Sequence, residues 1–98
     1  MKCYRARLSP EAAARIRRLH PQIKREIRQA IDLLINVPLS GHLLHFELAG
    51  LRSFRIRTHR IIYRINEDEA TLDILFVGAR RDIYEQYREL LLSRSPRN

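Results

Sequence analysis

The chain is poor in several residue types, and each shortage narrows what it can be. Its 98 residues include a single cysteine, Cys3, which excludes an internal disulfide and fits a reducing compartment such as the cytoplasm. Only 3 glycines are present, and no Gly-rich phosphate loop, repeat or low-complexity segment can be found. No apolar run approaches the ~20 residues needed to span a bilayer. No signal peptide is expected, since no apolar segment follows the basic residues 2–7.

Acidic residues are also scarce beside the basic ones. The chain has 11 Asp and Glu against 19 Lys and Arg, a formal net charge of +8. This excess predicts a polyanionic partner, either nucleic acid or an acidic protein. A membrane surface is not expected to be the partner, because no helix combines a wide apolar face with aromatic anchors. The length predicts one domain, residues 1–98, of which residues 93–98 should form a frayed tail.

A basic hairpin is predicted over residues 51–65, where apolar and polar residues alternate with period two. A two- or four-residue loop centred on Thr58 and His59 would place Arg55 opposite Ile62 and Arg57 opposite Arg60. One face then carries arginines around Ile62, and the other is apolar. The expected basic face holds Arg55, Arg57, Arg60 and Arg64, and the expected apolar face holds Phe54, Ile56, Ile61, Tyr63 and Ile65.

This register has an electrostatic consequence. Like charges directly opposite each other on paired strands are unfavourable. An Arg57–Arg60 pair therefore suggests an anion that neutralises both side chains. The alternative is a solvated basic strand face with no ligand.

The rest of the chain predicts an α+β fold in the order β-α-α-β-β-β-α. Residues 2–8 alternate as a first strand, with Cys3, Arg5 and Arg7 on one side. Ser9-Pro10 and Pro21 then open two helices that should pack on the apolar face of the sheet. Residues 71–77 are almost uniformly apolar and read as a central strand, and residues 82–92 form the last helix. The small sheet is expected to be antiparallel, but mixed at the first strand.

No metal site is predicted. His42 and His45 have a loose metal-like spacing, but no carboxylate or thiol pattern completes a ligand set. The stronger candidate is the basic hairpin together with Arg80, Arg81 and Tyr84, which follow the central strand. Guanidinium groups offer planar forks of donors that suit phosphate oxygens.

Three segments together resemble the RelE/ParE toxin superfamily, and its RelE branch most. They are residues 48–57 (Leu-Ala-Gly-Leu-Arg-Ser-Phe-Arg-Ile-Arg), residues 60–65 (Arg-Ile-Ile-Tyr-Arg-Ile) and residues 77–84 (Val-Gly-Ala-Arg-Arg-Asp-Ile-Tyr). The resemblance covers nearly the whole chain. It implies the toxin of a type II toxin–antitoxin pair, a ribosome-dependent endoribonuclease that cuts mRNA in the A site without metal or cofactor.

The resemblance also implies roles for particular residues. Attack of a ribose 2′-hydroxyl on phosphorus would rely on the catalytic set Arg55, Arg57, Arg60, Arg80 and Tyr84. Arg64, Arg81 and His59 would bind RNA. Two of the catalytic positions are lysines in some members of the family, and arginine is a poor proton acceptor. Tyr84 is then the expected general base or a stacking group, with His59 in reserve.

The resemblance implies partners as well. A cognate antitoxin should neutralise the chain, and the pair should bind operator DNA through the antitoxin; the ribosome and its mRNA would be the target in the cytoplasm. Two alternatives stay open: a ParE-like toxin that inhibits DNA gyrase without nuclease activity, and a non-catalytic nucleic-acid-binding module.

Overall fold

The structure is a computed structural model that describes residues 3–79 and 83–94. Strand β1 (Arg5–Leu8) is followed by helices α1 (Pro10–Arg17) and α2 (Pro21–Asn36). A short strand β2 (His42–Leu43) lies between the 3-10 turns η1 (Pro38–Ser40) and η2 (Phe46–Leu48). The chain ends with β3 (Arg52–Arg55), β4 (His59–Asn66), β5 (Thr71–Ala79) and α3 (Ile83–Arg94).

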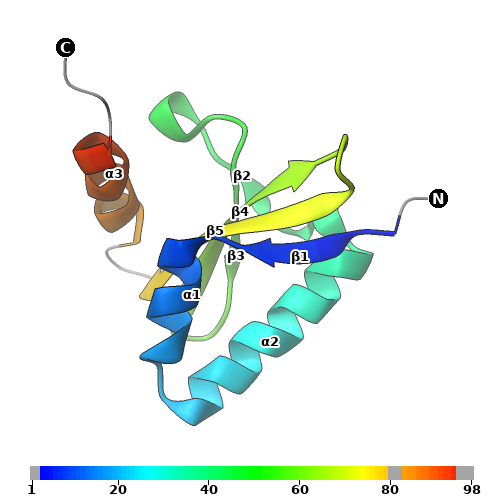
Figure 1. The fold of residues 1–98 in the computed structure, drawn as a ribbon, viewed down its shortest axis with the longest axis horizontal. Coiled ribbons are helices and arrows are strands. Elements are labelled where there is room, and N and C mark those ends of the chain that lie inside the picture. Colours follow the sequence, from blue (N-terminus) through cyan, green and yellow to red (C-terminus); the bar gives the residue numbers. More distant parts are fainter. Residues whose placement is uncertain (1–2, 80–82, 95–98) are drawn as a thin grey trace.

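The strands form one mixed sheet in the order β1-β5-β4-β3-β2, in which only the β1–β5 pairing is parallel. Helices α1 and α2 lie on one side of this sheet, and α3 lies on the other side with the projecting segment that carries η2 (Figure 1). The predicted α+β class and element order are confirmed. Strand β2 was not predicted, because two residues are too few to show a period.

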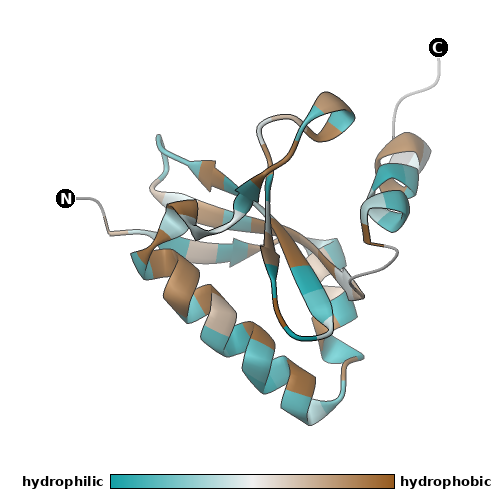
Figure 2. Ribbon diagram, turned by 180° about the vertical axis from the view of Figure 1, so that it is seen from behind, coloured by the Kyte–Doolittle hydropathy of each residue, from teal (hydrophilic) through white to brown (hydrophobic). Residues whose placement is uncertain are grey.

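Both early helices begin where the sequence predicts. The Ser9 side chain accepts a hydrogen bond from the Ala12 amide (3.0 Å), and Pro10 is the first residue of α1. His20 caps α2 by accepting from the Gln22 amide. Apolar and polar residues alternate around α2 (Figure 2), and its buried side chains are Ile27, Ala30 and Leu34. Helix α3 continues through Arg94, two residues beyond its predicted end at residue 92.

The predicted hairpin register is wrong by two residues. Arg55, rather than Arg57, lies opposite Arg60, and Ser53 lies opposite Ile62. Residues 56–59 connect the paired Arg55 and Arg60; His59 among them already belongs to β4 and accepts a hydrogen bond from the Ile56 amide at its carbonyl (2.8 Å). A shift of two preserves side-chain parity, so the predicted apolar face still packs against the helices.

A β-bulge in β5 reverses the face of the sheet to which the following side chains of this apolar strand point. Ile62 pairs with Phe76 but Tyr63 pairs with Ile74, so Leu75 is the extra residue. Before the bulge Ile74 faces α2, and after it Phe76 joins Ile62 on the opposite face. Strand β5 continues through Ala79, two residues beyond the end predicted from the sequence at residue 77.

The sheet therefore has two covered faces. The α2 face carries the larger core, in which Ile61, Tyr63, Leu72, Ile74 and Val77 meet α1 and α2. The α3 face carries a smaller core of Leu48, Ile62, Phe76, Ile83 and Tyr87. The expected basic face is thus only partly basic, since α3 covers its middle. None of the helices in the described part of the chain is long and apolar enough to cross a membrane.

One hydroxyl fastens the connector after α2 to the sheet. Tyr63 is fully buried, donates its hydroxyl hydrogen to the Pro38 carbonyl (2.6 Å) and accepts from the Gly41 amide (2.9 Å). Burial raises the pKa of this phenol. Gly41 has no room for a side chain, because a Cβ there would lie 2.6 Å from the Tyr63 hydroxyl oxygen and 3.0 Å from the Ser53 carbonyl oxygen.

Candidate functional site

A small polar cluster lies on the α3 face, where β3 and β4 meet the start of α3. Ser53 is fully buried, and its Oγ accepts hydrogen bonds from Arg60 Nη1 (3.1 Å) and from the Tyr84 hydroxyl (3.0 Å). The Arg60 guanidinium carbon lies 5.8 Å from the centre of the Tyr84 ring, within cation–π range. Two residues predicted to act together, Arg60 and Tyr84, are therefore in contact, and a serine fixes both.

Arg55 brings a second positive charge to this cluster. It is exposed at the end of β3 and is directly opposite Arg60 in the ladder. The like-charge pair expected from the sequence thus exists, with Arg55 in place of Arg57. Such a pair is unfavourable unless an anion or solvent neutralises it. We call Arg55, Arg60, Ser53 and Tyr84 the hairpin cluster.

Arg57 lies apart from the hairpin cluster. Because residues 56–59 connect the paired Arg55 and Arg60, Arg57 is not in the ladder, and its Nη2 pairs with Glu26 Oε2 of α2 (2.7 Å). Its guanidinium therefore points toward the α2 side. The predicted Arg57–Arg60 pair does not form, because Arg55 pairs with Arg60 instead and Arg57 lies in the connection between them.

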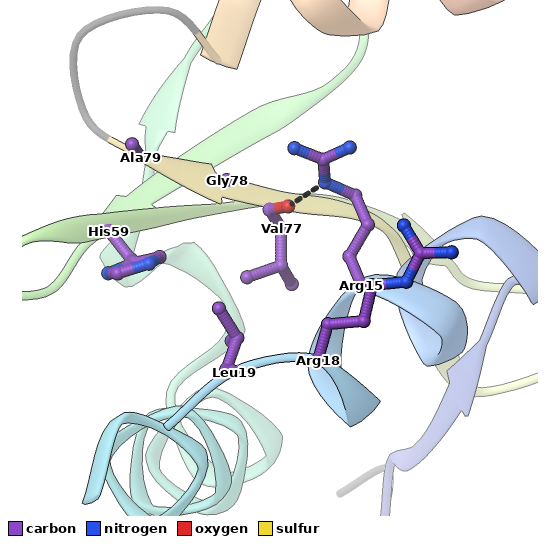
Figure 3. Close-up of a pocket in the computed structure, with 7 residues that line it drawn as sticks. All are labelled: Arg15, Arg18, Leu19, His59, Val77, Gly78 and Ala79. Carbon is purple, nitrogen blue, oxygen red and sulfur yellow. Dashed lines mark hydrogen bonds between the residues drawn. The ribbon is translucent and has the colours of Figure 1, made fainter. Parts of the chain in front are cut away.

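His59 also faces away from the hairpin cluster. It pairs with Ala79 on the α2 face and lines a pocket of about 270 Å³ with Arg15, Arg18, Leu19 and Val77 (Figure 3). Its Nδ1 is 2.7 Å from the Thr58 hydroxyl oxygen. The sheet thus separates His59 from Tyr84, so the geometry does not favour it as a substitute base.

Arg64 is on the α3 face but is engaged elsewhere. Its Nη2 donates to Asp73 Oδ2 (3.0 Å), and Arg7 of β1 donates to both oxygens of the same carboxylate. Although burial alone would raise the pKa of Asp73, the hydrogen bonds from Arg7, Arg64 and Thr71 lower it to about 2. Arg64 and Arg7 thus form a second basic group beyond α3.

Two other predicted residues, Arg80 and Arg81, lie outside the described residues, and the role predicted for each stays a prediction. Within residues 3–79 and 83–94, no group of His, Cys, Asp and Glu is arranged to hold a metal ion.

Sequence reasoning missed Ser53 and Arg15. In the sequence, Ser53 is a single small polar residue beside arginines, and no pattern indicates a role for it. Its full burial and its hydrogen bonds show that it positions Arg60 and Tyr84. Arg15 donates from Nε to the Val77 carbonyl (2.7 Å) and from Nη2 to Gln86 of α3 (2.9 Å). Strand β1 pairs with β5 only as far as Ile74, so the Val77 carbonyl receives its hydrogen bond from Arg15 instead of from β1. The bond to Gln86 links α1 to α3. Its helical spacing alone gives no sign of these distant partners.

The hairpin cluster has the chemistry of an anion site with an aromatic wall. Two guanidinium groups can bind the non-bridging oxygens of a phosphodiester and stabilise negative charge that develops there. A phenol beside them can stack on a nucleobase or exchange a proton.

Comparison with known proteins supplies independent information. Residues 6–84 match the family described as "ParE toxin of type II toxin-antitoxin system, parDE". The chain is 36% identical over 85 residues to Toxin RelG of Mycobacterium tuberculosis. The matched region covers 85% of this chain and 98% of that protein.

Solved structures agree with this family. The fold matches a chain of the toxin–antitoxin complex RelBE2 of M. tuberculosis with a TM-score of 0.72 and 35% identity, over 79% of this chain and 98% of that chain. It also matches a mutant of the E. coli toxin RelE in the free state, with a TM-score of 0.77 over 97% of this chain and 100% of that one. At 15% identity, the second likeness concerns the fold alone.

Proposed function

Since this chain belongs to the RelE/ParE superfamily and is a toxin of the type II toxin–antitoxin kind, we propose that it acts as a ribosome-dependent endoribonuclease. Its substrate is mRNA in the ribosomal A site, and cleavage stops translation. The reaction needs no metal or cofactor.

One observation carries this proposal: the Ser53 hydroxyl fixes both Arg60 and Tyr84 beside the exposed Arg55. A purely structural ion-pair network would pair Arg60 with a carboxylate. Among the described residues, Arg60 instead contacts a neutral hydroxyl and an aromatic ring, so its charge is left for an external anion.

The proposed reaction is a transesterification. The ribose 2′-oxygen attacks the adjacent phosphorus, and the bond from phosphorus to the 5′-oxygen breaks. The products are a 2′,3′-cyclic phosphate and a free 5′-hydroxyl. Arg55, Arg60 and Arg80 are proposed to stabilise the charge on the non-bridging oxygens, and donors of this kind typically contribute ~10²–10³ in rate.

A proton must leave the 2′-hydroxyl, and another must reach the departing 5′-oxygen. Arginine stays protonated and cannot accept the first proton. We assign the first step to Tyr84 in its phenolate form, which the Arg60 contact holds in the hairpin cluster. The phenol so formed, or a water molecule, then gives a proton to the departing 5′-oxygen. Stacking of the Tyr84 ring on a base is the competing role, and it needs no ionisation.

The other predicted residues receive supporting roles. Arg57 is proposed to act catalytically only after it leaves Glu26 and binds the substrate. This exchange is feasible because the Arg57 side chain is 69% exposed. Arg64, Arg81 and His59 are proposed RNA contacts outside the reacting centre.

The proposed partners follow from the same family. RelBE2 is a toxin–antitoxin complex, which supports a cognate antitoxin for this chain. The net charge of +8 suits an antitoxin with acidic segments, as well as ribosomal RNA. The toxin–antitoxin complex is proposed to bind operator DNA through the antitoxin, in the cytoplasm.

A second candidate function has its own support, because the matching family carries the ParE name. In that case the chain would inhibit DNA gyrase without cutting RNA. Induction of the wild-type chain in growing cells separates the two, with primer extension on abundant mRNAs and a parallel assay for DNA breaks. Codon-phased mRNA ends that disappear with Arg60→Ala support the nuclease. DNA breaks without mRNA ends would replace it by the gyrase function.

A further inference from the structure

A second basic group lies on the α3 face, built from three strands. Arg7 of β1 and Arg64 of β4 both reach Asp73 of β5, which lies between them in the sheet. Arg7 donates from Nε to Oδ1 (3.0 Å) and from Nη2 to Oδ2 (3.1 Å), while Arg64 donates from Nη2 to Oδ2 (3.0 Å). Thr71 completes the set with a hydrogen bond to Oδ1 (2.9 Å).

The group has more positive charge than its buried acid can neutralise. The Asp73 side chain is 6% exposed, whereas those of Arg7 and Arg64 are 53% and 52% exposed. One carboxylate between two guanidinium groups leaves a net charge of +1 at the surface. Glu69 in the preceding turn also acts on Arg7, but no described carboxylate other than Asp73 pairs with Arg64.

The two arginines line a hollow of about 280 Å³ that is also bounded by Ser9, Pro10 and Leu75. Ser9 and Pro10 form the N-terminal end of α1, which carries partial positive charge. The carboxylate holds both planar forks in fixed orientations, and each fork keeps N–H groups that Asp73 does not use. The hollow is thus a preorganised anion site rather than a self-neutralised ion pair.

We propose that Arg7 and Arg64 bind a backbone phosphate of RNA at a second point, away from the hairpin cluster. This proposal rests on the proposed function, because it takes RNA to be the ligand of the α3 face. Arg60 and Arg64 lie four residues apart on β4, so their Cα atoms are about 13 Å apart on the same face. Ile62 between them is buried beneath α3, and RNA must therefore meet two separate basic sites. Asp73 is the positioning residue of the second site.

The test measures binding without cleavage. A fluorescein-labelled 2′-O-methyl oligoribonucleotide of about 12 nucleotides cannot be cut by 2′-hydroxyl attack, and its anisotropy reports affinity across a range of salt concentrations. We expect Arg64→Ala to weaken binding about tenfold and to lower the salt slope by about 0.7. Arg28→Ala is the matched control, since Arg28 is an exposed arginine of α2 on the other side of the sheet.

Asp73→Asn separates positioning from simple charge. The substitution removes one negative charge and so raises the net charge of the group by one. An anionic ligand held by net charge alone would therefore bind more tightly. If Asp73 orients the two forks, binding weakens instead, at a temperature where thermal melting shows the variant to be folded. Tighter binding by Asp73→Asn, or equal losses in Arg64→Ala and Arg28→Ala, would overturn the second site.

Two further outcomes keep this proposal distinct from the proposed function. Wild-type chain that fails to cut mRNA on ribosomes, while Arg64→Ala still loses RNA affinity, refutes the nuclease and supports the second site. An Arg64→Ala variant that loses affinity for the antitoxin but keeps its RNA affinity assigns the hollow to an acidic protein segment and refutes the RNA proposal.

Discussion

Asp73→Asn should remove a pH-dependent part of the stability, and the structure gives its size. The carboxylate has a pKa of about 2 in the folded chain, against an ordinary value of 3.8. Each pKa unit corresponds to ~1.4 kcal/mol, so ionised Asp73 contributes about 2 kcal/mol to the free energy of unfolding. Because the folded pKa is depressed, this contribution is complete above the unfolded pKa and disappears as pH falls toward 2.

Urea unfolding followed by far-UV circular dichroism at pH 6, 4, 3 and 2 measures this contribution. At pH 6 the wild-type chain should exceed Asp73→Asn by about 2 kcal/mol. At pH 2 most of that gap should be gone, because protonated Asp73 resembles the amide in charge and shape. Other acids titrate equally in both chains and cancel from the difference.

The matched control is Asp68→Asn, an exposed acid in the turn before β5. It should change the free energy of unfolding by less than about 0.5 kcal/mol at any of these pH values. An Asp73→Asn gap that is the same size at pH 6 and pH 2 would refute the reasoning, since the loss would then come from packing rather than from the Arg7 and Arg64 ion pairs.

Three other changes test the site and the fold. Arg60→Ala should lower single-turnover cleavage on programmed ribosomes about 10²–10³-fold with little change in Tm, and unaltered cleavage by a folded variant would remove Arg60 from the mechanism. Tyr84→Phe should lose about 10²-fold in the same assay if the phenol accepts the proton; a loss only in Tyr84→Ala would assign the ring to stacking. Gly41→Ala should destabilise the fold by about 1–3 kcal/mol, because the new methyl group would meet the Tyr63 hydroxyl and the Ser53 carbonyl. A melting curve that matches wild type would show that the connector moves aside at no cost.

Features that depend on neighbouring residues were predictable from the sequence. The starts of α1 and α2 follow from Ser9-Pro10 and Pro21, since a cap and a proline act locally. The apolar face of the hairpin was also predicted correctly despite the wrong register. Side chains alternate with period two, so a shift of two residues leaves each residue that stays in the ladder on its own face.

Features that depend on distant partners were not predictable. The bulge at Leu75 arises within a run that is apolar on both faces, so no alternation marks it. Arg57 leaves the predicted basic face for Glu26, and that partner lies 31 residues away in the chain. At the candidate site, Arg55, Arg60 and Tyr84 were anticipated as a group, whereas Ser53 was not. A buried serine that orients two other side chains has no sequence signature of its own.

The division into two cores bears on how the molecule opens. Among the described residues α3 packs on the smaller core through Ile83 and Tyr87, and the Arg15–Gln86 hydrogen bond ties it to α1, while the larger core does not involve it. Helix α3 can therefore detach at a lower free energy than global unfolding requires, and its amide hydrogens should exchange with solvent faster than those of β4. Tyr84 departs with α3 and loses both Ser53 and Arg60. The fraction of molecules with a complete hairpin cluster then depends on the equilibrium between docked and detached α3. A change of ~1.4 kcal/mol in the docking free energy changes the ratio of docked to detached molecules tenfold.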